Sequence, residues 1–128
     1  MAIGTDEMKR IAIALVVPTM LMLAYSAAWT MNHEAAERGK ALFENPNFAG
    51  GVKACSSCHP KGKRLFKAGM KNEFSIMGKK QHSLAEAINF CIVNANRGKA
   101  IPEDSEEMQE MVSFIKSLSP QSTPGYGK

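Results

Sequence analysis

The sequence has 128 residues, enough for one small domain. Apolar residues make up 45% of the chain but aromatic residues only 7%, so the chain alone brings little bulky side-chain mass to a core. The formal net charge of +4 comes without a nucleic-acid-binding motif or basic runs interleaved with aromatic residues, and we expect no nucleic-acid partner.

Residues 1–29 combine a basic start with an apolar stretch. Lys9 and Arg10 precede the apolar residues 11–23, and small residues fill most of positions 24–28. This pattern is typical of a secretory signal peptide. Residues 11–29 are also long enough for a membrane anchor, since roughly 17–25 residues span a bilayer. Both interpretations predict that the domain from residue 30 lies in the periplasm or on the extracytoplasmic face of the inner membrane.

A first helix is expected over residues 34–44. Ala35, Gly39, Leu42 and Phe43 recur at helical spacing, and Asn45-Pro46-Asn47 ends the pattern. Gly39 would allow a second helix to cross closely, or it is merely a tolerated glycine.

The sequence Cys55-Ser56-Ser57-Cys58-His59 follows. Two cysteines three positions apart with a histidine directly after them are the attachment signature of c-type haem, in which each thiol adds to a haem vinyl group and the histidine ligates the iron. One helical turn would present both sulfurs and the imidazole of His59 to the same face of the porphyrin. The alternatives are a redox-active cysteine pair and half of a zinc site. The first would require a βαβ context, and the second would require another regularly spaced Cys/His pair; the sequence has neither.

The segment from residue 61 to residue 80 has no clear periodicity, and we expect a loop without strand pairs. It holds one acidic residue, Glu73, and seven basic residues: Lys61, Lys63, Arg64, Lys67, Lys71, Lys79 and Lys80. Such a segment is either a solvated basic face or a rim that attracts an acidic partner.

Two further helices are expected. Ser83 with Glu86 has the spacing of a capping box at the start of a helix over 83–94, and Asp104 or Ser105 would cap the last helix. The apolar face of the first consists of Leu84, Ile88, Cys91, Ile92 and Ala95. The apolar stripe of the second consists of Met108, Met111, Val112, Ile115 and Leu118, and residues 120–128 form a polar, flexible tail.

The order of the expected elements is a helix before the Cys55–His59 motif, a loop, a middle helix and a C-terminal helix. This order resembles that of class I c-type cytochromes. The stretch Gly39-Lys40-Ala41-Leu42-Phe43 is also similar to that family. The resemblance covers residues 34–119. It implies an all-α domain, within residues 30–119, around one covalent haem c, with crossing first and last helices. Such cytochromes usually supply a methionine to the iron just before the last helix. This chain has Ile101-Pro102 there, and isoleucine cannot bind iron.

A narrower resemblance covers residues 39–118. The segments 84–91, 97–102 and 104–109 are similar to the haem domains of thiosulfate dehydrogenase and related thiosulfate-oxidising cytochromes, with an Ile-Asn-x-Cys stretch and a Gly-Lys-x-Ile-Pro turn. In that group the cysteine that matches Cys91 is the distal ligand of the catalytic haem. Those enzymes have a second haem domain, whereas this chain has one attachment motif, and the loop between His59 and Cys91 is short for the group.

These observations predict that Cys55, Cys58 and His59 hold the haem and that Cys91 is the sixth iron ligand. Met70, Met77 and His82 are alternative ligands, as is an open or water-bound position; a buried structural thiol is the alternative role for Cys91. The predicted function is single-electron transfer between redox proteins, such as a multihaem cytochrome or a respiratory complex. A thiosulfate- or sulfur-oxidising cytochrome, or the haem subunit of such an enzyme, is the alternative.

Overall fold

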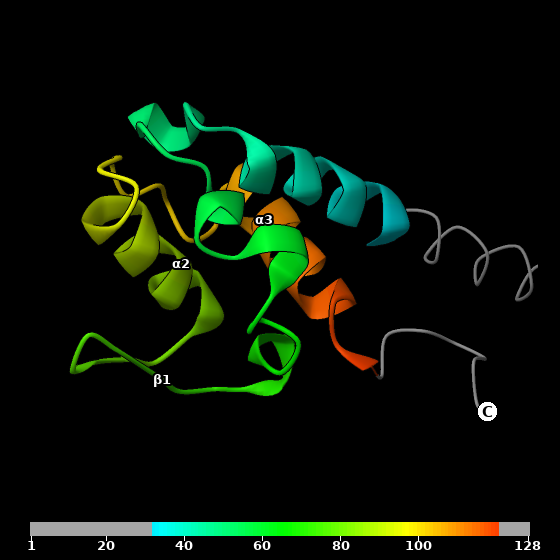
Figure 1. Cartoon of the computed structure of the whole chain (residues 1–128). Helices are drawn as coiled ribbons and strands as arrows, with labels where there is room; N and C mark the ends of the chain where they lie inside the picture. Colours follow the sequence, from blue (N-terminus) through cyan, green and yellow to red (C-terminus); the bar gives the residue numbers. More distant parts are fainter. Residues whose placement is uncertain (1–31, 121–128) are drawn as a thin grey trace, which may run out of the picture. The chain divides into compact units, whose positions relative to one another are not determined.

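The computed structural model describes residues 32–120, which form helices, short turns of 3-10 helix and one hairpin (Figure 1). The predicted signal peptide or anchor, residues 1–29, lies outside the described residues, and so does the predicted tail beyond Pro120. Among the residues described, no helix is both long and apolar enough to cross a membrane. Within the described chain, residues 34–120 belong to one compact unit. The domain is mostly helical, as the sequence predicts.

The first helix occupies residues 32–44 of the described chain and packs across α3 (Glu106–Ser117). Gly39 makes this crossing possible, because a Cβ atom there would collide with the carbonyl group of Glu110 and the Cβ atom of Phe114. The expectation that Gly39 permits a close helix crossing is therefore confirmed. The rings of Phe43 and Phe114 continue the contact, with centroids 5.1 Å apart.

An ion pair joins the first helix to α3 where they cross. Arg38 donates from Nε to the carboxylate of Glu110, and Glu34, one turn earlier, lies 3.0 Å from another guanidinium nitrogen of Arg38. Glu110 is buried although it is charged, so Arg38 supplies the partner that a buried carboxylate requires. This contact fixes the rotation of the two helices about each other.

Helix α2 (Leu84–Asn94) and helix α3 begin where the sequence predicts. The hydroxyl of Ser83 accepts a hydrogen bond from the Glu86 backbone N–H at 2.9 Å, and Ser105 accepts one from Met108 at 3.3 Å. The Glu86 carboxylate accepts from the backbone N–H of His82, one residue before the position that a capping box would use. The apolar stripes of the helices meet in a core whose fully buried side chains are Ile92, Met108 and Met111.

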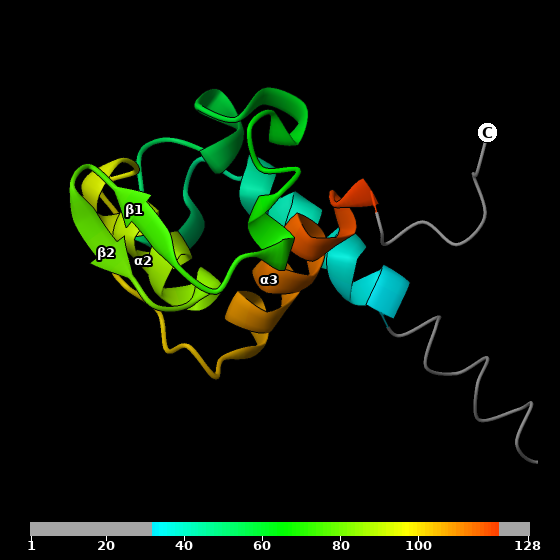
Figure 2. The same ribbon diagram turned by 90° about the horizontal axis from the view of Figure 1, so that it is seen from below.

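The loop expected between residues 61 and 80 contains a hairpin, so the expectation of no strand pair was wrong. Strand β1 (Phe74–Ile76) pairs antiparallel with β2 (Lys79–Gln81), and Ile76 lies opposite Lys79 (Figure 2). Met77 and Gly78 both have positive φ angles, of 52° and 77°, as the tight turn of a two-residue hairpin requires. The hairpin packs against α2.

Candidate haem site

The motif cysteines lie on one tight turn. Residues Cys55–Ser57 form a 3-10 helix, and the Cys55 carbonyl accepts hydrogen bonds from Cys58 N at 3.2 Å and from His59 N at 3.0 Å. The backbone thus makes the single helical turn that the spacing predicts. Cys55, Cys58 and His59 all line one cavity.

The His59 ring is oriented by a backbone carbonyl. Its Nδ1 lies 3.1 Å from the carbonyl oxygen of Lys63, four residues later. A carbonyl oxygen accepts hydrogen bonds and does not donate them, so Nδ1 carries the proton in this arrangement. In a neutral imidazole with this tautomer, Nε2 keeps its lone pair and can bind a metal.

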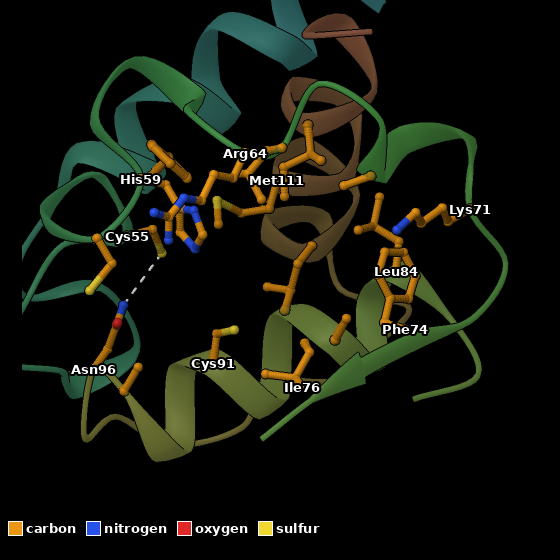
Figure 3. A pocket seen from close by; sticks show the side chains of 18 of the residues that line it. Cys55, His59, Arg64, Lys71, Phe74, Ile76, Leu84, Cys91, Asn96 and Met111 are labelled. Atoms are coloured by element: carbon orange, nitrogen blue, oxygen red, sulfur yellow. Dashed lines mark hydrogen bonds between the residues drawn. The ribbon is translucent and has the colours of Figure 1, made fainter. Parts of the chain in front are cut away.

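The cavity between the motif and α2 has a volume of about 270 Å³ (Figure 3). Cys55 and His59 lie on one wall, and Cys91 and Ile76 lie on the other. Most of the remaining lining is apolar. It comes from the first helix, the loop after the motif, β1, α2 and α3, and includes Phe43, Leu65, Phe74, Leu84, Ile88, Met111 and Ile115. Phe74 and Ile76 reach it because alternate residues of a strand point to the same side.

Cys91 differs in position from the other candidate sixth ligands. It lines the cavity that holds His59, whereas Met70 and His82 line a different hollow and Met77 occupies the hairpin turn with 81% of its surface exposed. The expected apolar face of α2 is also present, since Leu84, Ile88 and Cys91 all contribute to the cavity wall. Cys91 is half-buried, which leaves its sulfur accessible from the cavity.

Burial raises the pKa of both the Cys55 and the Cys91 thiol, so both are neutral in the haem-free chain near neutral pH. For Cys55, a hydrogen bond from the Asn96 side chain, 3.4 Å from Sγ, works in the opposite direction. Asn96 is itself buried at 5% exposure. The sequence pattern does not reveal this contact, because Asn96 lies 41 positions from Cys55 and only the fold joins them.

Three basic residues of the segment 61–80 also line the cavity: Arg64, Lys67 and Lys71. The charge pattern of this segment predicts a rim or a solvated face, but it does not distinguish these three residues from the other basic residues. All three are exposed overall, so they lie where the cavity meets solvent.

These residues fit a covalently attached haem. Two thiols and an imidazole with a free Nε2 sit on one wall, and the apolar lining suits the faces of a porphyrin. A haem carries four nitrogen ligands of its own, so one histidine and one further side chain complete its iron. Among the described residues no group of three or more His, Cys, Asp or Glu side chains could hold a bare metal ion.

The chain matches no protein-family model, and no curated protein or solved structure is significantly similar to it. The resemblance to thiosulfate-oxidising cytochromes therefore stays a prediction.

Proposed function

We propose that this chain is an extracytoplasmic c-type cytochrome that carries single electrons between redox proteins. One haem c would be attached through thioether bonds to Cys55 and Cys58. His59 would bind the iron on one face through Nε2, and Cys91 would bind it on the other. The haem would accept and release the electron, and the protein residues hold it, exclude water from its faces and set its potential.

The observation that carries the proposal is that Cys55, Cys58, His59 and Cys91 line the same apolar cavity. An apolar pocket with a few convergent polar groups is the usual form of a cofactor site. The hydrogen bond between His59 Nδ1 and Lys63 supports the ligand role, because ligating histidines are commonly held by such a bond at the other ring nitrogen.

The attachment is tested by expressing the full chain in cells that carry out cytochrome c maturation. We expect an intact mass increased by one haem, and a colour that acidic acetone does not extract. Changing Cys55 and Cys58 together to serine should abolish both, because thioether bonds need the two thiols. Cys91→Ser is the matched control, since it removes a thiol from the same cavity but should leave the haem covalently bound. A wild-type protein without covalent haem would overturn the proposal.

A second candidate is oxidation of thiosulfate or a related sulfur compound. The presence of Cys91 opposite His59, together with three cations at the cavity wall, favours a site for an anionic sulfur substrate. The haem-loaded protein should be mixed with thiosulfate and ferricyanide, alone and with a multihaem cytochrome. Turnover by the protein alone would contradict the carrier function and favour the enzyme.

The redox partner that we propose is acidic where it contacts this chain. All seven basic residues of segment 61–80 are exposed, and three of them reach the cavity that would hold the haem. Opposite charge on a multihaem cytochrome or a subunit of a respiratory complex would steer the encounter toward this side. The apolar residues 11–29 would carry the chain to the membrane or across it.

A further inference from the structure

Arg64, Lys67 and Lys71 stand out from the rest of the cavity wall by their charge. In the described part of the chain no aspartate or glutamate lines this cavity. Its titratable lining groups are these three cations, His59 and the three cysteines. Cations that border an apolar cavity without a counter-ion attract anionic groups more strongly than cations surrounded by water.

Resting on the proposed function, we propose that Lys67 and Lys71 bind the two propionate carboxylates of the haem. Haem is apolar on its faces, and these carboxylates are its negative groups. The vinyl groups and the propionates are on different pyrrole rings, so attachment to Cys55 and Cys58 directs the carboxylates away from these cysteines. Figure 3 shows Lys71 at the other end of the cavity from Cys55, with its ammonium group turned inward. Arg64 extends toward His59 and Cys55 in the same figure, so it is not part of the proposed site.

Lys67 and Lys71 differ in position from other basic residues of the same segment. Lys79 and Lys80 are also exposed but do not line the cavity. If these four lysines merely formed a solvated basic face, the two pairs would affect the haem alike. If the lining residues bind the propionates, their charges act at short range, where solvent and salt screen least.

The test compares two charge-matched variants of the full haem-loaded chain, K67Q/K71Q and K79Q/K80Q. Each loses the same positive charge. We expect both to keep the covalent haem, and the lining variant to lower the reduction potential by at least about twice as much as the control. The reason is that nearby cations disfavour the more positive ferric state, so their removal stabilises it.

A second readout is the dependence of the potential on pH. Nearby cations lower the pKa of a carboxyl group and keep the propionates ionised through the near-neutral range, so the wild-type potential should stay nearly constant there. In the lining variant the propionate pKa rises, and ionisation then occurs within that range. Because an ionised propionate favours ferric iron, the potential should fall as pH increases. The control variant should follow the wild type.

Equal shifts and identical pH profiles for the two variants would overturn the propionate site while leaving the proposed function intact. Wild-type protein without covalent haem would instead overturn the proposed function itself. Should the lining variant fail to mature, the single variants Lys71→Gln and Lys79→Gln provide the same comparison.

Discussion

The side chain of Asn89 forms two hydrogen bonds with the backbone of Ile101. Its Nδ2 donates to the Ile101 carbonyl at 2.8 Å, and its Oδ1 accepts from the Ile101 N–H at 2.9 Å. The loop before α3 is thereby tied to α2, two residues before Cys91. This loop is where a class I cytochrome would present a methionine, and here its backbone is held against the helix that carries the thiol.

Replacing Asn89 by alanine should destabilise the domain by about 2 kcal/mol, because both polar groups of Ile101 lose their partner. Denaturant unfolding would measure the loss, and amide exchange at Ile101 should speed up. Asn94→Ala is the control, since Asn94 is exposed and makes a single bond to the Phe90 carbonyl within its own helix. It should change stability by less than about 0.5 kcal/mol. Equal losses of unfolding free energy in the two variants would mean that the Asn89 hydrogen bonds stabilise the domain no more than the exposed Asn94 bond does.

Cys91→Ala should remove the thiolate signature from the electron paramagnetic resonance spectrum and raise the reduction potential, because thiolate is a strongly donating ligand. The iron should also become open to added ligands. Coordination would overcome the burial that raises the pKa of the Cys91 thiol, since a bound metal ion deprotonates a coordinating thiol. Met70→Ala and Met77→Ala serve as controls and should leave the spectrum unchanged. An unchanged Cys91→Ala spectrum with a methionine–iron band at the red end of the visible range would identify Met70 or Met77 as the ligand.

Electron transfer to an acidic redox partner should slow steeply as salt increases, because the screening length shrinks to about 8 Å at physiological ionic strength. Stopped-flow mixing over a range of salt concentrations would measure this. Replacing Lys79 and Lys80 with glutamine should flatten the dependence, since both are exposed. A neutral small-molecule reductant, used as the control, should react at a rate independent of salt. A flat profile with the protein partner would leave the segment 61–80 as a solvated face.

Gly39→Ala should destabilise the domain by about 3 kcal/mol, since the added methyl group collides with the Glu110 carbonyl across the helix crossing. The sign of the effect is decisive. At an open helical position the same change would stabilise by up to about 1 kcal/mol. Thermal unfolding of the haem-loaded protein would measure it, and any increase in stability would contradict the close crossing.

The pattern of residues 1–29 predicts that the domain lies outside the cytoplasm. A reporter enzyme that is active only outside the cytoplasm, fused after residue 31, should be active, because Lys9 and Arg10 retain the N-terminus inside. The intact mass of the mature protein would then separate the two interpretations. A chain that begins near Ala27 or Trp29 indicates a cleaved signal peptide, and retention of residue 1 with membrane fractionation indicates an anchor. An inactive fusion would contradict both.

The sequence by itself determined the local features of this protein. The caps at Ser83 and Ser105, the turn at Cys55–His59 and the apolar faces of the helices all depend on residues within a few positions of one another. Each could therefore be predicted from spacing. The hairpin escaped prediction because its strands are three residues long and β2 is mostly charged, although Met77-Gly78 was an available turn signal.

The tertiary structure alone decided which distant residues meet. Sequence spacing left Cys91, Met70, Met77 and His82 as competing ligands, and the fold places α2 opposite the motif, so that Cys91 lines the same cavity as His59. The contacts of Asn96 with Cys55, and of Gly39 with Glu110, likewise join residues far apart in the chain. Such pairs depend on how helices and loops fill a shared volume, and the local periodicity of a sequence carries no information about that.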